Sequence, residues 1–417
     1  MASKELVIES RVEDINKVVS HINKIEALPN SIESFLDFYK EKLPKDLNKR
    51  YRLRIRIRNN KSSKYNPYIR LANSEDALEI AEIIQNDYDG TYPYKEMEDE
   101  SEIRRMIETG KYKFILFTSD SGEILGSTCF VINLKEKKGY LRSLVVKKKW
   151  IGILDTKKAY VSACLLIWNK FRNDISLWWA ETRTADAKTQ YITRECGLKP
   201  IAWLPNKDIF YDKIESDLLI INYNNQRIKK FRAVVLPILI PECLNCFLYS
   251  DSQYNLGEFH VIKPDLALNQ KKIKEIYNKS NLIIHQKPFG YQEVGFNFRD
   301  SSSFFKFLYT PRVKNIEKVK YKINNLEELY VFIIKMREFA IKSKIRYIEI
   351  YTSAYDPFHQ EVLNKLGFHP RGYIPAWELN FYTMRFDDKI LFNWYDEKLN
   401  DFELSEDAKN LLNYIKM

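Results

Sequence analysis

The sequence predicts an α/β protein with mixed sheets, built from two similar domains in tandem. Three observations predict this fold class: an internal repeat, a regular succession of strand and helix patterns, and a globular composition. The chain has 417 residues, of which 45% are hydrophobic and only 12 are glycine. This apolar share can offset the entropy lost on ordering, so the composition excludes a disordered chain. The length suggests two or three domains.

The internal repeat joins a segment that begins at Thr184 to one that begins at Ala354. Four pairs of identical residues recur 170 positions apart: Gln190 with Gln360, Gly197 with Gly367, Pro200 with Pro370 and Pro205 with Pro375. Two further pairs recur 171 positions apart: Asp217 with Asp388 and Asn222 with Asn393. So many matches in register predict two copies of one domain.

Each repeated segment has the same expected structure. An amphipathic stretch predicts a short helix that ends at Gly197 or Gly367, because a left-handed helix cap favours glycine. A strand follows, and Pro205 and Pro375 then mark a turn into a second strand. We expect the two strands to pair as a hairpin in both copies.

Hydrophobic periodicity extends the first copy toward the N-terminus. It predicts these strands and helices in chain order: strand 68–71, helices 75–86 and 100–108, strands 113–118, 126–134 and 139–147, helix 156–171 and strand 176–182. Asp155 is the expected N-cap of the long helix, since a carboxylate there accepts hydrogen bonds from free backbone N–H groups.

This order of elements resembles that of the GNAT acetyltransferase superfamily over residues 68–224. Two strings carry the resemblance, TYPYKEMEDESEIRRMIETGKYKFILFTSDSGEILGS and the run from Tyr191 through CGL to the closing strand. The first is similar to the acceptor loop, second helix and first hairpin of these enzymes. Residues 257–397 resemble a reduced copy that lacks the second helix.

The resemblance implies a division of the chain into five parts. They are an N-terminal extension (1–66), an acyl-CoA-binding GNAT domain (67–224), a linker (225–256), a degenerate GNAT-like domain (257–397) and a helical tail (398–417). The extension is expected to hold helices and then the strand Tyr51–Arg58. That strand alternates apolar residues with Arg52, Arg54, Arg56 and Arg58, so one face would be cationic.

The resemblance also implies a place for acetyl-CoA as the acyl donor. In the family a loop of pattern VxPxxRGxGxG/A binds the coenzyme pyrophosphate through backbone N–H groups at a helix start. The matching string here is VKKKWIGILDT, in which only Gly152 keeps a glycine, and three lysines precede it. The residues implied are Leu144, Val146, Ile151, Gly152, Ile153, Leu154, Asp155 and Thr156. The alternative is a basic turn that simply precedes a structural helix.

The second copy has no such loop. Its matching string, KVKYKINNLEELY from Lys318, has asparagines able to cap a helix but no glycine. We therefore expect one coenzyme per chain. No metal is expected either, because the pair Cys243 and Cys246 lacks the second pair that a zinc site needs.

The residue types that often catalyse transfer in the family are absent from the matching positions of this chain. A carboxylate often stands where this chain has Tyr140, and a tyrosine acid where it has Thr193. Glu181, near the end of its strand, and Tyr191, on the next helix, are the candidate substitutes; a surface carboxylate and a packed ring are the alternatives. Tyr92 and Tyr94 in the acceptor loop are the candidate substrate-binding residues, with core packing as the alternative.

These observations favour a cytoplasmic acyl-CoA-dependent N-acyltransferase, most simply an N-acetyltransferase. Its acceptor would be a small amine or amino acid, or else a protein amine. One alternative is a non-catalytic GNAT-like binding or scaffold protein. Another is a nucleic-acid-linked acyl- or aminoacyl-transferase, suggested by the net charge of +11 and the arginine face. No apolar run is long enough to predict a membrane span.

Overall fold

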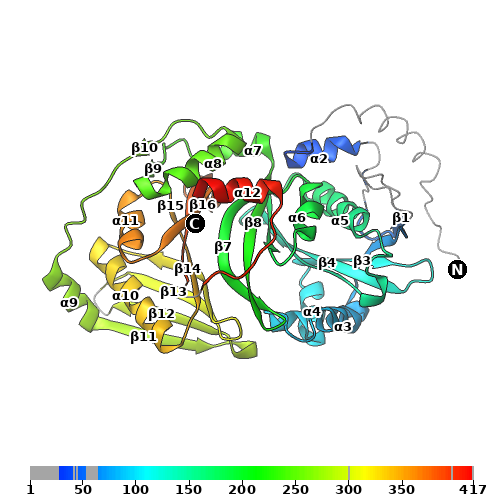
Figure 1. The fold of residues 1–417 in the computed structure, drawn as a ribbon, viewed down its shortest axis with the longest axis horizontal. Helices are drawn as coiled ribbons and strands as arrows, with labels where there is room; N and C mark the ends of the chain where they lie inside the picture. Colours follow the sequence, from blue (N-terminus) through cyan, green and yellow to red (C-terminus); the bar gives the residue numbers. More distant parts are fainter. Residues whose placement is uncertain are drawn as a thin grey trace. The chain divides into compact units, whose positions relative to one another are not determined.

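The computed structural model describes residues 28–40, 43, 46–52, 64–298, 301–395 and 398–415 (Figure 1). The chain divides into two compact units. Unit 1 comprises residues 1–182, 187–199 and 220–227, and unit 2 comprises 183–186, 200–219 and 228–417. In the described part of the chain, no helix is both long and apolar enough to cross a bilayer.

The first copy has the predicted order of elements. Its strands are β1 (Tyr51–Arg52), β2 (Tyr68–Leu71), β3 (Tyr112–Thr118), β4 (Ile124–Asn133), β5 (Lys138–Val146), β6 (Leu177–Arg183), β7 (Lys199–Phe210) and β8 (Lys213–Tyr223). Its helices are α2 (Ile32–Phe38), α3 (Ala77–Asp87), α4 (Glu100–Glu108), α5 (Thr156–Lys170), α6 (Lys188–Arg194) and α7 (Asn225–Phe231), with 3-10 turns at Ser74–Asp76, Lys95–Met97 and Lys148–Trp150. From β2 to β8 the succession is β-α-α-β-β-β-α-β-α-β-β, as predicted.

Unit 1 is built around a mixed sheet in which β5 and β6 are the parallel pair. Ten of the fifteen residues of α5 are buried, because this helix packs its whole length into the core. Trp168 of α5 stacks on Trp178 of β6 with ring centroids 5.8 Å apart, and Phe35 of α2 meets Trp168 at 5.0 Å. The apolar face of α2 therefore completes the core of unit 1.

Unit 2 contains the second copy. Its strands are β9 (Ile238–Leu239), β10 (His260–Val261), β11 (Ser280–Gln286), β12 (Gln292–Phe298), β13 (Phe304–Thr310), β14 (Asn315–Lys322), β15 (Tyr347–Ser353), β16 (His369–Asn380) and β17 (Arg385–Tyr395). Its helices are α8 (Leu244–Tyr254), α9 (Gln270–Lys279), α10 (Leu326–Lys342), α11 (Pro357–Lys365) and α12 (Glu406–Ile415), with 3-10 turns at Pro241–Cys243 and Pro288–Gly290.

The two mixed sheets have equivalent strand orders. The first runs β2-β3-β4-β5-β6-β8-β7 after the short edge strand β1, and the second runs β11-β12-β13-β14-β15-β17-β16. Both sheets are flanked by helices, so the predicted fold class is confirmed. The second copy was predicted to lack one helix, but within its described residues it lacks both of the helices that join the first two strands of this sheet order in the first copy. Only the short 3-10 turn Pro288–Gly290 joins β11 to β12, a connection too short for either of the helices that join β2 to β3.

The repeated glycines end helices in the predicted way. Gly197 and Gly367 have φ angles of +79° and +81°. The N–H of the next residue, Leu198 or Phe368, donates to the carbonyl five positions earlier, at 3.3 Å and 3.0 Å. This is the hydrogen-bond pattern of a Schellman cap, which favours glycine at the left-handed position.

The repeated prolines do not mark hairpin turns, and that prediction was wrong. Pro205 lies inside β7 and Pro375 inside β16. The residues that follow them, Asn206 and Ala376, have φ angles of +53° and +48°, and the pairing of β16 with β17 shifts register at this point. A proline cannot donate to a strand ladder, so it is tolerated at a bulge.

All five cysteines are free and buried. Burial raises the pKa of Cys129 and of Cys246 to about 12, so their thiolates are scarce at neutral pH. Among the described residues, no three Cys, His, Asp or Glu side chains form a group that could hold a metal ion.

We expect the native protein to resist thiol-reactive probes, because burial blocks access to all five thiols and raises the pKa of Cys129 and Cys246. All five thiols should react after denaturation. A colorimetric thiol titration with and without guanidinium measures this, and rapid reaction of any thiol in the native protein would contradict the expectation.

Candidate functional site

The central strands of unit 1 separate along their length. β5 and β6 pair from Lys138 with Leu177 to Leu141 with Ala180. Both strands continue beyond this last pair. We call this place the strand opening, formed by residues 142–146 of β5 and 181–182 of β6.

A bulge in β5 lies at the strand opening. The pairing with β4 jumps from Cys129–Arg142 to Ser127–Val145, and Ser143 between them has a φ of +56°. A non-glycine residue in this region is uncommon and often marks a functional site.

The bulge also affects where backbone donors point. The N–H of Lys147 donates to the carbonyl of Leu125, on the β4 side. Since donors alternate along a strand, the N–H groups of Leu144 and Val146 face the other edge, toward the strand opening. Two of the predicted cofactor-binding residues therefore place backbone donors where β6 has moved away.

Aromatic and charged side chains cover one face of β5 at this point. The hydroxyl oxygens of Tyr92 and Ser143 lie 3.0 Å apart. The guanidinium of Arg142 lies 5.3 Å from the ring centroid of Tyr94, and its Nη2 is 3.6 Å from a carboxylate oxygen of Glu96. Burial raises the pKa of Tyr92. The two predicted acceptor-loop tyrosines thus lie at the strand opening, although Tyr92 is only 6% exposed.

Glu181 lies on the same face of the sheet as Arg142. Tyr140 and Trp179 pair across β5 and β6, and their rings stack with centroids 4.2 Å apart. Arg142 and Glu181 each come two residues later, so alternation returns both to that face. The Tyr140 ring is therefore packed against Trp179 on this face of the sheet.

On α6, neither Tyr191 nor Thr193 is clearly placed to protonate a departing thiolate. Tyr191 is 49% exposed. The Thr193 hydroxyl donates to the carbonyl of Thr189 at 2.9 Å, within its own helix. A role for Tyr191 in transfer stays a prediction.

Backbone N–H groups of the predicted pyrophosphate loop already donate hydrogen bonds within the protein. The N–H groups of Ile153 and Leu154 both donate to the carbonyl of Trp150, at 3.1 Å and 2.9 Å. The N–H of Asp155 donates to the carbonyl of Tyr65 at 3.0 Å, and that of Thr156 to the carbonyl of Leu154 at 2.9 Å. Four backbone donors at the loop and helix start are therefore already engaged.

Asp155 occupies the position where the pyrophosphate was predicted. Its carboxylate caps α5 by accepting from the N–H of Lys158 at 3.1 Å, and the residue is 3% exposed. A buried carboxylate at a helix start repels an anion there. Gly152 has a φ of +83°, so a side chain at this residue would be strained even though an added Cβ would meet no protein atom within 4 Å.

The three lysines before the loop each have a carboxylate partner. Lys147 contacts Glu79 at 2.5 Å, Lys148 contacts Asp89 at 2.7 Å and Lys149 contacts Glu123 at 2.6 Å. Such exposed pairs are weak and exchange readily with other anions.

Unit 2 has a strand opening of its own, which a lysine covers. β14 and β15 pair only at Asn315–Tyr347 and Ile316–Ile348, and Lys318 in β14 has a φ of +54°. The next residues along the two strands are Glu317 and Glu349. The Nζ of Lys207 lies 3.5 Å and 3.1 Å from their carboxylates.

Lys207 is held in place on both sides. Its side chain is only 2% exposed. Its carbonyl accepts from Nδ2 of Asn315 at 2.6 Å and from Nη2 of Arg346 at 2.8 Å. Tyr347 donates its hydroxyl to Glu349 at 3.0 Å. We call Lys207, Glu317 and Glu349 the buried triad.

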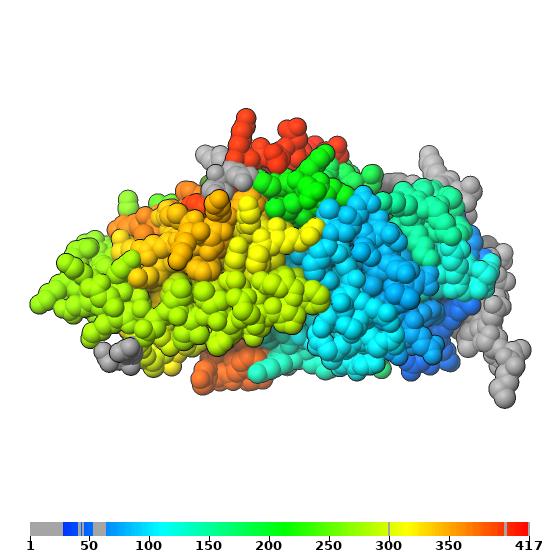
Figure 2. All heavy atoms as spheres, turned by 90° about the horizontal axis from the view of Figure 1, so that it is seen from below, coloured from blue at the N-terminus to red at the C-terminus, as the bar shows by residue number. Residues whose placement is uncertain are grey.

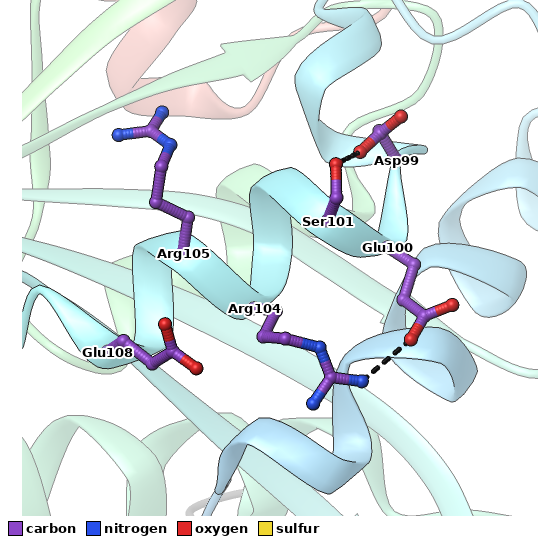
Figure 3. Close-up of a pocket in the computed structure, with 6 residues that line it drawn as sticks. All are labelled: Asp99, Glu100, Ser101, Arg104, Arg105 and Glu108. Carbon is purple, nitrogen blue, oxygen red and sulfur yellow. Dashed lines mark hydrogen bonds and ion pairs between the residues drawn. The ribbon is translucent and has the colours of Figure 1, made fainter.

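Two surface features lie away from the strand openings. A pocket of about 460 Å³ follows the outer face of α4 (Figure 3) and is lined by Asp99, Glu100, Ser101, Arg104, Arg105 and Glu108. Arg104 pairs with Glu100 at 2.7 Å along the helix, as expected of a solvated face. Elsewhere, the edge strand β11 exposes Leu282, Ile283 and Ile284. The part of the chain that holds β11 is yellow-green in Figure 2.

The arginine-faced strand is described only at its start. Tyr51 and Arg52 form β1, and the rest of the predicted strand lies outside the described residues. Arg52 and Arg50 both pack on the ring of Tyr68, at 5.2 Å and 4.2 Å from its centroid. A nucleic-acid interface on this face stays a prediction.

Sequence reasoning missed four residues at the strand openings: Glu96, Arg142, Ser143 and Lys207. Strand alternation from Tyr140 could have placed Arg142 on the same face. No sequence signal identifies Lys207, because its partners lie more than a hundred positions along the chain.

Comparisons with known proteins show limited likeness. No family model matches the chain, and no curated protein matches it. Among solved structures, a chimera of the spermidine N-acetyltransferase SpeG from Vibrio cholerae and hSSAT is 11% identical, with a TM-score of 0.32, over 38% of this chain and 96% of that one. Another, the ribosomal-protein-S5-alanine acetyltransferase from Vibrio fischeri, is 12% identical, with a TM-score of 0.31, over 38% of this chain and 92% of that one. Such values assign neither an acceptor nor an activity to this chain.

Proposed function

We propose that unit 1 is an N-acyltransferase that moves an acyl group, most simply acetyl, from a coenzyme A thioester to an amine. The observation that carries this proposal is the strand opening with the bulge at Ser143. Backbone donors of Leu144 and Val146 face that opening, where they would polarise a thioester carbonyl. Carboxylate, phenol and guanidinium groups lie on the same sheet face.

The proposed reaction needs only proton transfers from the protein. The neutral amine attacks the thioester carbonyl carbon, a C–N bond forms, and the C–S bond breaks. One proton leaves the nitrogen, and one is taken up by the thiolate of the departing coenzyme. We propose that Glu181, the carboxylate nearest the end of the parallel pairing, accepts the proton from the nitrogen. Solvent or Tyr191 then donates the proton that the thiolate takes up.

The proposed donor fits the strand opening better than it fits the loop. The outward-facing amides suit the acyl end of the thioester. The closed loop and the cap at Asp155 do not suit a pyrophosphate. We therefore propose that coenzyme A is held mainly through its acyl end and pantetheine arm, with the lysines before the loop as cationic contacts.

Unit 2 is proposed to be a degenerate copy that binds no coenzyme. Its strand opening is covered by the buried triad, which puts a lysine amine against two carboxylates. An incoming thioester would have to displace a side chain that is 2% exposed. One coenzyme per chain is therefore expected.

A second candidate function is a GNAT-like binding protein without catalysis. The closed loop favours it, as do the tyrosine and threonine at the usual catalytic positions. The two candidates differ in one measurement. Calorimetry with acetyl-CoA, followed by a thiol-release assay with an amine panel, detects binding and turnover separately; absence of both would overturn the acyltransferase proposal.

The cap at Asp155 leads to a quantitative expectation. The variant Asp155→Asn keeps a side-chain oxygen for the N–H of Lys158 but removes the negative charge from the helix start. We expect acetyl-CoA to bind about two- to five-fold more tightly, the size of a charge effect at a helix terminus. Calorimetric titration of the variant and wild type measures this.

A matched control is available in the same unit. Asp99 caps α4 by accepting from the N–H of Glu102 at 2.9 Å, far along the chain from the loop. Asp99→Asn should leave acetyl-CoA affinity unchanged. If Asp155→Asn weakens binding, or if both variants change it equally, the charge at the helix start is not what limits binding.

A further inference from the structure

Arg142 is a largely buried cation that lies beside the Tyr92 hydroxyl and has no carboxylate within hydrogen-bond length among the described residues. Its side chain is 11% exposed, and its nearest carboxylate oxygen, on Glu96, is 3.6 Å away, beyond hydrogen-bond length. Within the described part of the chain, the buried Nε of Arg142 has no hydrogen-bond partner. A largely buried charge is stabilised when its donors are paired, so an anionic ligand at this place would complete the pairing.

The position of Arg142 relates it to the proposed reaction. It is the first residue of β5 beyond the last parallel pair, and Glu181 is the first of β6. Both lie on the face that carries the stacked rings of Tyr140 and Trp179. A cation and a carboxylate thus border the strand opening, one on each strand.

We propose that Arg142 binds a carboxylate of the acyl acceptor and that the acceptor is an amino-acid-like molecule, with an amine and a carboxylate a few bonds apart. The guanidinium offers paired N–H donors that match a carboxylate. Glu181 lies on the other side of the strand opening, where it would receive the amine. This inference rests on the proposed function and deepens it.

The same arrangement selects against polyamines. A diamine or polyamine is cationic at both ends at neutral pH, so one end would approach a buried guanidinium. Like charges at short range in a poorly solvated place repel strongly.

The experiment compares amines that differ only by a carboxylate. L-lysine is paired with 1,5-diaminopentane, and 5-aminopentanoate with butylamine. Equilibrium binding to the full chain is measured by calorimetry in the presence of coenzyme A, and turnover is measured with acetyl-CoA. We expect each amino acid to bind at least about 10-fold more tightly than its partner, the scale of a charge-assisted hydrogen bond.

Variants of Arg142 separate recognition from folding. Arg142→Gln should remove the preference within each pair, raising KM for the amino acid more than it lowers kcat, and Arg142→Lys should restore part of it. Arg70→Gln is the control, because Arg70 is also a partly buried arginine of unit 1 and pairs with Asp76 at 2.7 Å. Thermal unfolding of all three variants shows whether they remain folded.

Two failures are distinguishable. If acetyl-CoA neither binds nor turns over, the proposed function fails, and selective binding of the amino acids would still support the Arg142 site. In the second case, acetyl-CoA is turned over, but both members of each pair bind and react alike, or no amino acid binds. The inference about the acceptor is then overturned, while the proposed acyltransferase function is retained.

Discussion

Replacing Lys207 with methionine is expected to lower the free energy of unfolding of unit 2 by about 3–5 kcal/mol, because breaking a buried ion pair leaves uncompensated charge in the interior. Lys207→Met fills a similar volume but leaves Glu317 and Glu349 facing each other without a cation. The loss should appear as a lower denaturation midpoint in urea and a lower melting temperature.

Removing the rest of the triad should recover most of that loss. The triple variant Lys207→Met, Glu317→Gln, Glu349→Gln leaves no charge within the triad, and such replacements are often neutral or stabilising. Lys409→Met is the matched control, since Lys409 pairs with Glu406 on an exposed helix face at 2.8 Å and should matter by less than about 0.5 kcal/mol. Equal stability of Lys207→Met and wild type would show that the triad does not stabilise unit 2.

Adding a single methyl group at Gly139 is expected to destabilise unit 1 by about 3 kcal/mol, at the upper end of overpacking effects. Gly139 of β5 pairs with Trp178 of β6, and a Cβ at Gly139 would lie 2.0 Å from a carbon of that indole. Trp178 cannot move aside cheaply, because it is 1% exposed and stacked on Trp168. Gly139→Ala should also displace β6 beside the strand opening and weaken acetyl-CoA binding.

A second strand glycine provides the control for this prediction. Gly295 of β12 has ordinary backbone angles, and its nearest neighbour to an added Cβ is the carbonyl oxygen of Phe305 at 3.8 Å. Gly295→Ala should therefore be tolerated. Comparable unfolding midpoints for Gly139→Ala and Gly295→Ala would mean that the contact with Trp178 relaxes easily.

The fold could be predicted from the sequence because its signals are local. The order of strands and helices follows from hydrophobic periodicity, and the helix ends at Gly197 and Gly367 follow from the conformational freedom of glycine. The repeated prolines were misread, because proline marks both turns and bulges. Which of the two it marks depends on whether the chain continues as a strand beyond it, which the local pattern does not decide.

The site was less predictable because its decisive features are tertiary. The closing of the coenzyme loop depends on Tyr65, which lies ninety residues before Asp155 and takes the hydrogen bond of its N–H. The cap at Asp155 was foreseen, but its conflict with an anion became clear only when the carboxylate was seen buried at the helix start. Arg142 is one of many arginines in the sequence, and its place beside the strand opening, which depends on how β5 and β6 pair, is what distinguishes it.

The interleaving of the two units has a consequence for synthesis on the ribosome. Residues 200–219 belong to unit 2 but are followed by 220–227, which belong to unit 1. Lys207 therefore leaves the ribosome before the strands that carry Glu317 and Glu349. At typical translation rates a delay of about a hundred residues lasts roughly 5–20 s. During that time Lys207 lacks both of its carboxylate partners, and we expect nascent chains that end between 230 and 310 to depend on chaperones more than the finished protein does.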